Sequence, residues 1–557
     1  MLGYMRISKN VAPWLLLVLL LIGSSSAYAF DIPTGSDDVS LRWDNSLRYT
    51  LMNRVAPQNQ SILNSPNGDD GDRNFKKGIV SNRLDILSEA DLVYKSSYGV
   101  RVSGAFWYDQ AYHNNFDNDS VGTSNVLNAN GRQTVNRLSE NAKNYYAGPA
   151  GELLDAFIFG KIEAGPVPVY LKLGRHVYSW GQGLINPIHA ISYGQMPLDF
   201  QKGIAQPGVE AKEIFRPTNM ASAIAQITPE FQIAGQYYLQ WERNRLPLEG
   251  TYFGSSDVAL DGDGVLIAGP GAFIHHGRDI EAARNRDFGL AAQWSPQFLN
   301  DATFGFYYRK FSDRMPQLII NLNGDPGTNP NNWLYHAAFK SDIDLYGISY
   351  ATKVLDLSVG AELSYRQHMP LVSNPATIFN STALPDNGHI LGAYGDTMHG
   401  VINVFGLLKK SPVWDTGNWL FEFNYSRWLN VESDPQRTFK GDESYTGFDK
   451  VTKDAGTVNL VFTPQYLQIL PGLDLDVPLS VTYGLWGVSA VSGGGGKGDG
   501  TWGIGLNFTY LTRYKLNFNY VSYFGQLEDS PAGAVARGPY ALYKDRDFVS
   551  MTFKVTF

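Results

Sequence analysis

The chain of 557 residues contains no cysteine. This argues against a small secreted domain held together by disulfides, and it suits an oxidising compartment, where stray thiols are hazards. Beyond the first 29 residues there is no apolar run of about 18 residues, so we expect no helical membrane anchor. Neither sign of charge dominates, with 45 basic and 53 acidic residues, and nothing in the sequence resembles a nucleic-acid-binding patch.

Catalytic and metal-binding motifs are also missing from the sequence. There is no Gly-x-Ser-x-Gly nucleophile elbow. The nine histidines are scattered, apart from the adjacent pair His275 and His276. We therefore expect neither an enzyme activity nor a cofactor.

The first 29 residues are typical of a secretory signal peptide. Residues 1–10 carry Arg6 and Lys9 without an acidic residue, residues 14–22 (WLLLVLLLI) form a short apolar core, and residues 27–29 (AYA) are small enough for cleavage. We expect residues 30–557 to form a single domain, because no linker-like change of composition divides them.

Residues 39–55 (VSLRWDNSLRYTLMNRV) alternate apolar and polar side chains. As a strand, this stretch would set one apolar face against one charged face: Leu41, Trp43 and Leu47 against Arg42, Asp44 and Arg48. Its length exceeds the usual strand length of about 5 to 6 residues in soluble proteins. A transmembrane barrel suits both faces, because lipid contacts the apolar face and a wet lumen contacts the charged one.

The same period-two pattern recurs along the chain and predicts about eighteen strands. They are 39–55, 81–94, 100–112, 154–163, 167–178, 219–228, 231–243, 285–295, 302–312, 341–352, 355–367, 396–408, 418–430, 453–464, 476–488, 501–512, 515–525 and 547–557. The connections alternate between long and short, as long external loops and short periplasmic turns do in outer-membrane barrels. We predict an all-β, antiparallel transmembrane barrel of about 16 to 20 strands, with eighteen preferred.

The chain ends in DFVSMTFKVTF, an amphipathic strand with a terminal Phe557. Such an ending is typical of the signal that the barrel-assembly machinery of Gram-negative bacteria recognises. The expected location is therefore the cell outer membrane, where the protein would contact lipid and lipopolysaccharide.

Several stretches carry a resemblance to a known family. They are LGRHVYSWGQG (173–183) with INP (185–187), QPGVEAKEIFRP (206–217), ELSYRQHMPL (362–371), QILPGLDLDVPLS (468–480) and the terminal KDRDFVSMTFKVTF. In this order they resemble an uncharacterised family of Gram-negative outer-membrane proteins, family 1302 of the domains of unknown function. The resemblance implies a single large barrel, often encoded beside periplasmic lipid-handling proteins and inner-membrane efflux-type transporters, and suspected of moving hydrophobic molecules.

Strand parity directs a set of charged side chains toward the predicted lumen. The assigned residues are Arg42, Asp44, Arg48, Arg83, Asp85, Glu89, Asp91, Arg101, Arg309, Glu362, Arg366 and Glu422. Because both signs are interleaved, pairing between neighbouring strands is the favoured interpretation, and steering of an anionic or amphipathic solute is the alternative. Arg366, which lies in a stretch shared with the family, is the best candidate for a role beyond pairing.

The stretch 180–217 is predicted to fold into the lumen and constrict it. It is rich in Gly, Pro and Ile, and it is apolar for an external loop. A barrel of about eighteen strands would otherwise enclose an open aqueous path. Trp180 and Phe215 are predicted to offer apolar surface to the solute, with Ile185, Ile188 and Ile204. The alternative is an external lid against lipopolysaccharide.

Two further features depart from simple alternation. Arg175 falls on the lipid-facing parity of its strand, so we expect either a bulge at Gly174 that turns it inward, which is preferred, or a place at the outer rim. In the preferred case Arg175 lines the solute path. Asp69, Asp70 and Asp72 are predicted to form a hydrated acidic loop tip, with divalent cations shared with lipopolysaccharide as the alternative.

Taken together, these patterns predict an outer-membrane channel for passive passage, with uptake favoured, of hydrophobic or amphipathic molecules such as lipids, hydrocarbons, sterol-like or aromatic compounds. The alternatives are the terminus of a lipid export system coupled to an inner-membrane pump, a general hydrophilic porin and, less favoured, an outer-membrane lipase or esterase. The partners expected beyond the cargo are the assembly machinery, a periplasmic lipid-handling protein and an inner-membrane efflux-type transporter.

Overall fold

The computed structural model describes residues 30–120, 122–131, 133–205, 211–258, 260, 264–284, 286–299, 301–322, 333–379 and 384–557. The predicted signal peptide (1–29) and the first part of the stretch 206–217 lie outside the described residues. No helix of the described chain is long and apolar enough to cross a membrane.

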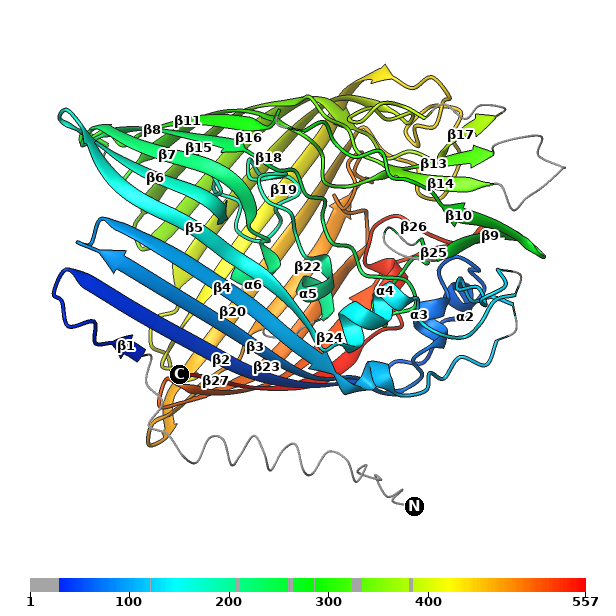
Figure 1. The fold of residues 1–557 in the computed structure, drawn as a ribbon, viewed down its shortest axis with the longest axis horizontal. Helices are drawn as coiled ribbons and strands as arrows, with labels where there is room; N and C mark the ends of the chain where they lie inside the picture. The colour runs from blue at the N-terminus through cyan, green and yellow to red at the C-terminus, as the bar shows by residue number, and fades with distance from the viewer. Residues whose placement is uncertain are drawn as a thin grey trace.

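The long amphipathic stretches form one closed antiparallel barrel (Figure 1). Its eighteen strands are β2 (Val39–Arg54), β3 (Gly78–Tyr94), β4 (Tyr98–Asp109), β5 (Ala150–Ala164), β6 (Val167–His176), β7 (Thr218–Thr228), β8 (Phe231–Tyr238), β11 (Phe288–Trp294), β12 (Thr303–Phe311), β15 (Ile343–Val354), β16 (Leu357–Pro370), β18 (Tyr394–Leu407), β19 (Thr416–Ser433), β20 (Asp454–Leu470), β22 (Leu479–Trp486), β23 (Gly500–Tyr510), β24 (Tyr514–Phe524) and β27 (Phe548–Thr556). The predicted strand number and the position of every predicted strand are confirmed.

The first and last long strands close the barrel. β2 pairs with β3 on one side and with β27 on the other, with Arg48 opposite Asp85 and Lys554. Two short strands join the same sheet: β1 (Phe30–Ile32) pairs with β2, and β21 (Leu473–Asp476) lies between β20 and β23. Because β2 has a partner along both edges, the barrel has no free edge there that could pair with another chain.

The two faces of the wall differ as the alternation predicts. On β2, β3 and β4 the outward side chains Trp43, Ile86 and Phe106 are 46%, 41% and 56% exposed. The inward Arg48 is only 4% exposed. An apolar outer face and a charged inner face are the pattern of strands that separate lipid from a polar lumen.

Long connections gather at one end of the barrel, opposite the short turns (Figure 1). They contain a second sheet and short helices: β17 (Ala376–Phe379), β13 (Gln317–Leu322), β14 (Leu334–Ala338), β10 (Ala272–His276), β9 (Val265–Gly269), the hairpin β25 (Leu527–Ser530) and β26 (Gly533–Ala536), α2 (Gln60–Leu63), α3 (Asp70–Arg73), η1 (Gln110–His113), α4 (Glu140–Ala142), η2 (Lys143–Ala147), α5 (Phe200–Ala205), α6 (Ala211–Ile214) and η4 (Ala541–Tyr543). The long connections therefore contain regular secondary structure that is separate from the barrel wall.

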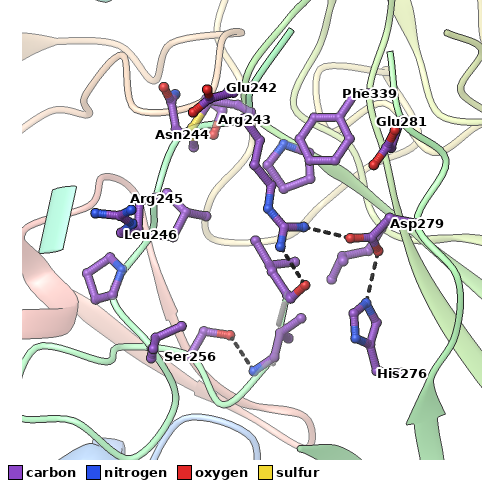
Figure 2. A pocket seen from close by; sticks show the side chains of 18 of the residues that line it. Glu242, Arg243, Asn244, Arg245, Leu246, Ser256, His276, Asp279, Glu281 and Phe339 are labelled. Atoms are coloured by element: carbon purple, nitrogen blue, oxygen red, sulfur yellow. Dashed lines mark hydrogen bonds and ion pairs between the residues drawn. The ribbon is translucent and has the colours of Figure 1, made fainter. Parts of the chain in front are cut away.

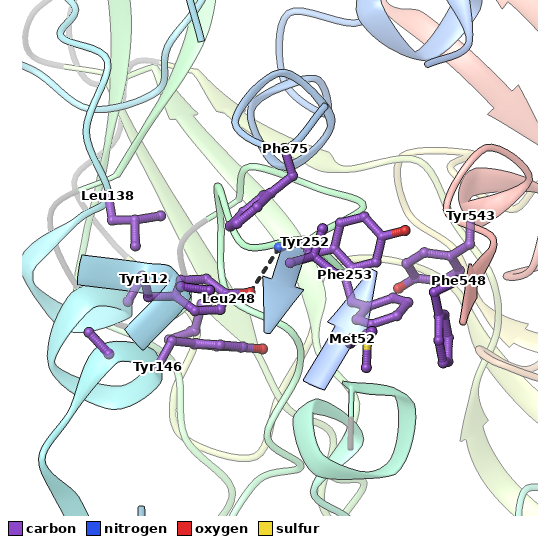
Figure 3. Packing of buried hydrophobic residues seen from close by; sticks show 14 of the residues in the cluster. Met52, Phe75, Tyr112, Leu138, Tyr146, Leu248, Tyr252, Phe253, Tyr543 and Phe548 are labelled. Atoms are coloured by element: carbon purple, nitrogen blue, oxygen red, sulfur yellow. Dashed lines mark hydrogen bonds between the residues drawn. The ribbon is translucent and has the colours of Figure 1, made fainter. Parts of the chain in front are cut away.

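An aromatic cluster packs these connections together (Figure 3). The ring of Phe253 makes edge contacts with Tyr543 and Phe548, at centroid distances of 6.1 and 5.8 Å. The hydroxyl of Tyr112 accepts a hydrogen bond from the backbone N–H of Tyr252. Aromatic side chains bury large apolar areas, so this cluster holds together loops that are distant in sequence.

Candidate functional site in the barrel lumen

The connection between β6 and β7 contains the stretch 180–217, and its first half lies against inward-facing side chains of β12, β16 and β19. Glu362 of β16 accepts hydrogen bonds from the backbone N–H groups of Gln182, Gly183 (2.8 Å) and Ile191 (2.7 Å). Carboxylates bound by several backbone N–H groups form strong, charge-assisted hydrogen bonds. The stretch is thereby tied to one strand of the wall through main-chain atoms.

Glu422 of β19 binds the next residues in the same way. Its carboxylate accepts from the N–H groups of Leu184 (2.7 Å) and Asn186 (2.8 Å), among others. Gly181 makes this path possible, because it adopts φ +102° and a Cβ there would lie 2.3 Å from Glu362 Oε1. Only glycine fits this position without displacing the carboxylate.

Two arginines bind the carbonyl groups of the same stretch. The Arg309 guanidinium of β12 donates to the carbonyls of Ile191 (2.9 Å) and Tyr193 (2.6 Å). Arg366 of β16 donates to the carbonyls of Ile188 (3.0 Å) and Ala190 (2.9 Å). Arg366 is fully buried by these contacts, and its role in steering a solute stays a prediction.

The second half of the stretch binds a different part of the wall. Glu213 of α6 forms an ion pair with Arg48 of β2 at 2.9 Å, and Lys212 pairs with Glu89 of β3. Lys202 of α5 pairs with Glu152 of β5. In strand order, β2 to β5 lie about halfway round the barrel from β12 to β19. The stretch is therefore attached to opposite walls.

Sequence reasoning missed Lys202, Lys212 and Glu213. In the printed sequence they are ordinary charged residues between two apolar motifs. Their partners lie on strands 50 to 165 residues away. They can be predicted only if the segment is first assumed to enter the lumen. The inward-facing Arg48 and Glu89 then need partners of opposite charge, which Glu213 and Lys212 supply.

The remaining wall charges are largely paired within strands and also between neighbouring strands, as the favoured interpretation expects. Between strands, Arg101 of β4 contacts Asp91 of β3 at 3.1 Å. Arg42 contacts Asp44 at 2.7 Å, and Arg83 contacts Asp85 at 2.9 Å. Arg48 approaches Asp85 across the ladder at 3.5 Å, in addition to its pair with Glu213. Mutual pairing of this kind leaves no dominant sign of charge on this part of the wall.

The preferred prediction for Arg175 is wrong. The ladders of β6 with β5 and with β7 run through Gly174 without a shift of register, so there is no bulge. Arg175 keeps its outward parity and forms an ion pair with Glu242 at 2.5 Å, in the connection after β8. It thus lies at the rim of the barrel, which was the second of the two expectations, and does not line the lumen.

The apolar side chains of the stretch are less available than predicted. Trp180 and Ile188 are each only 6% exposed, because they pack in a cluster with Tyr307 and Phe311 of β12. Phe215 is half-buried, and its backbone forms an isolated antiparallel β-bridge with Leu198 of the same stretch. Close packing against the wall leaves Trp180 and Ile188 little surface to offer to a solute.

The acidic tip is also not hydrated. Asp69, Asp70 and Asp72 are at most 2% exposed. Asp72 pairs with the buried Arg54 at 2.6 Å, and burial raises the pKa of Asp70 to about 7. The described residues contain no group of three or more acidic or histidine side chains placed to hold a metal ion.

A cavity of about 1140 Å³ lies beside the stretch at the end with the long connections (Figure 2). Gln201 and Arg216 of the stretch line it, together with the connection after β8 and the loop sheet. In Figure 2 Arg243 points toward Asp279 across the cavity, at 2.6 Å, and Asp279 also contacts His276 at 2.9 Å. This cavity was not predicted from the sequence.

These features define an eighteen-stranded antiparallel β-barrel protein in which the connection between β6 and β7 contacts opposite walls of the lumen. The chain belongs to the family described as Protein of unknown function (DUF1302), whose model matches residues 10–557. The resemblance noted in the sequence is thereby confirmed.

The chain was also compared with curated proteins and with solved structures. No curated protein matched. OccK1 (OpdK) of Pseudomonas aeruginosa is 10% identical, with 93% of this chain and 98% of that chain covered and a TM-score of 0.38. OccAB4 of Acinetobacter baumannii is 10% identical, with coverage of 93% and 98% and a TM-score of 0.40. A BenF-like porin from Pseudomonas fluorescens Pf-5 is 11% identical, with coverage of 93% and 98% and a TM-score of 0.37.

Proposed function

We propose that this protein is an outer-membrane channel for the passive passage of hydrophobic or amphipathic molecules, and that the stretch 180–217 narrows its lumen. The observation that carries the proposal is the attachment of that stretch to both sides of the barrel, by Glu362 and Glu422 on one side and by Arg48 on the other. An eighteen-stranded barrel without such an obstruction would hold a wide aqueous path.

The lengths of the connections indicate which end of the barrel faces the cell exterior. The long connections are assigned to the cell exterior and the short turns to the periplasm, as in other outer-membrane barrels. The cavity beside the stretch, which is lined mainly by long connections, then lies on the external side of the barrel. Apolar side chains in its lining, among them Leu246, Leu260 and Met315, favour a cargo with an apolar part.

A hydrophilic porin is the second candidate, and the charged side chains of the inner wall favour it. Arg42 and Asp44, for example, lie toward the end with the short turns, and the Arg42 side chain is 56% exposed. A porin of this kind would pass ions and small polar solutes freely, whereas a narrowed channel would not. Conductance therefore separates the two candidates.

The test uses a point variant and a deletion. Gly181→Ala places a methyl group where Glu362 now binds the backbone, and Gly203→Ala is its control, because a Cβ at Gly203 meets only ordinary contacts at 3.7 Å. In planar bilayers we expect higher single-channel conductance for Gly181→Ala and unchanged conductance for Gly203→Ala. Replacing 181–216 by a short Gly/Ser linker should raise conductance further and sensitise cells to bulky hydrophilic antibiotics.

The deletion should also weaken growth on a hydrophobic carbon source, because the stretch supplies part of the cavity lining. Removal of the hairpin 527–536, which lies in another connection, is the matched control and should change neither property. Unchanged conductance after deletion of 181–216 would refute the narrowing. Higher conductance with undiminished hydrophobic uptake would favour the hydrophilic porin.

A further inference from the structure

The cavity in Figure 2 has the size and the mixed lining of a small-molecule site. Its volume of about 1140 Å³ is slightly above the range of about 300 to 1,000 Å³ for ligand pockets. The residues that enclose it come from the stretch 180–217, from the connection after β8, from the loop sheet and from Tyr543 near the C-terminus. A bound molecule would thus contact several connections at once.

Part of the lining is apolar. The residues concerned are Trp241, Leu246, Pro247, Leu248, Val258, Leu260, Met315, Pro316, Leu318 and Phe339. Trp241 and Phe339 meet edge to face at a centroid distance of 4.8 Å, which fixes both rings. Phe339 is only 1% exposed and supports Trp241 from behind, whereas Trp241, Leu246 and Met315 are partly exposed. An apolar chain or ring of a ligand would find a preformed surface on these three side chains.

The charged part of the lining contains five arginines and three acidic residues, so positive charges exceed negative ones by two. Three of the arginines already have close partners. Arg216 pairs with Glu242 at 2.9 Å, Arg243 with Asp279 at 2.6 Å, and Arg245 with Asp199 at 2.5 Å. These three guanidiniums therefore add little attraction for a further anion.

The other two arginines are available. Within the described part of the chain, the exposed Arg278 guanidinium has no hydrogen-bond or ion-pair partner. Arg284 has an 85% exposed side chain and only a long contact of 3.9 Å with Glu281, and such exposed pairs are weak. Because Asp199, which is not part of the lining, neutralises Arg245, the cavity keeps one net positive charge, and this matches a group with a single negative charge.

We propose that this cavity binds an amphipathic monocarboxylate, with the carboxylate attracted by Arg278 and Arg284 and the apolar part on the surface formed by Trp241, Leu246 and Met315. The inference rests on the proposed function, because it names the class of cargo that the channel takes up first. Guanidinium groups bind carboxylates through charge-assisted hydrogen bonds.

The test measures binding to the full-length protein in nonionic detergent by titration calorimetry, with octanoate as the probe. Octanamide lacks the charge, acetate lacks the apolar part, and octyl phosphate replaces the carboxylate by a phosphate. We expect octanoate to bind more tightly than any of the other three. The double variant Arg278→Gln/Arg284→Gln should weaken octanoate binding about tenfold or more. Arg437→Gln, an exposed arginine outside the cavity, should leave it unchanged.

Several results would overturn the inference. Equal affinity for octanamide would remove the role of the charge, and equal affinity for acetate would remove the role of the apolar surface. Tighter binding of octyl phosphate would assign the site to phosphate groups, whether free or in lipopolysaccharide. Unchanged octanoate affinity in the double variant would place the binding elsewhere. None of these outcomes alters the conductance of the deletion variant, so the inference can fail while the proposed channel stands.

Discussion

At the residue scale, burial of carboxyl groups at the mouth of the barrel makes the loops sensitive to pH. Asp70 and Asp72 have pKa values raised to about 7, and Asp69 to about 6, chiefly because burial disfavours their charged forms. Their folded-state pKa values lie above the unfolded value of 3.8. The carboxyl groups therefore bind protons more tightly in the folded loops than in the unfolded chain. As a result, the stability of the loops falls as the pH rises from about 4 to about 7.

Asp70→Asn should remove part of this dependence. The amide oxygen can still accept from the N–H of Asn125, which now donates to Asp70 Oδ2 at 2.8 Å. We expect the connection 55–77 to be more stable at pH 8 in the variant, by an amount on the order of a few kcal/mol, and little changed at pH 4. Hydrogen exchange of this connection at both pH values measures the effect. Asp119→Asn, whose carboxylate is 84% exposed, is the control, and an equal response of the two variants would contradict the explanation.

Strand parity predicted where the charged residues point but not what they bind. Glu362, Arg366, Glu422 and Arg309 were all placed on the inner wall from alternation alone, and the structure places them there. Their partners are backbone atoms of another segment, and backbone groups carry no sequence signal. For Arg175 the predicted direction itself was wrong, because a bulge was expected to turn it inward. A charged residue at the end of a strand can keep its outward parity and still find a partner in a neighbouring loop, here Glu242.

At the scale of elements, the long strands were predictable and the loop sheet was not. A strand such as β2 repeats its alternation over 16 residues, which no helix imitates. β9, β10 and β17 have 5, 5 and 4 residues, too few for a period to be read. In addition, β10 pairs with β14 and β13 with β17 in parallel, between separate connections, so their formation depends on contacts that the local sequence does not contain.

The last strand allows a prediction at the same scale. Phe557 exchanges backbone hydrogen bonds with Asn45 of β2, at 2.7 and 2.8 Å, and so completes the seam of the barrel. Phe557→Asp should slow assembly into the membrane, because the terminal aromatic serves as recognition element and interfacial anchor. Thr556→Ala removes only a side-chain contact with Ser46 on the lumenal face and should assemble normally. Equal amounts of the two variants in outer-membrane fractions would contradict this role.

At the scale of the whole molecule, the absence of cysteine makes the orientation directly measurable. Lys77→Cys places a single exposed thiol between β2 and β3 at the end with the long connections, and Ser96→Cys places one in the short turn between β3 and β4. A membrane-impermeant maleimide applied to intact cells should label the first variant and spare the second. Both should react after the outer membrane is permeabilised. Labelling of Ser96→Cys alone in intact cells would reverse the assigned orientation.

The two ends of the stretch 180–217 are bound to the barrel wall by different kinds of contact. On the side of β12, β16 and β19 it is held through main-chain groups, so most changes of its side chains leave that end in place. On the side of β2 and β3 it is held by the side-chain ion pairs of Glu213 and Lys212, and the Arg48–Glu213 pair is buried, so dissolved salt screens it little. Sequence variation is therefore tolerated unequally along the stretch. A single change at Glu213 removes an ion pair that holds the second end, whereas the first end depends on the path of its backbone.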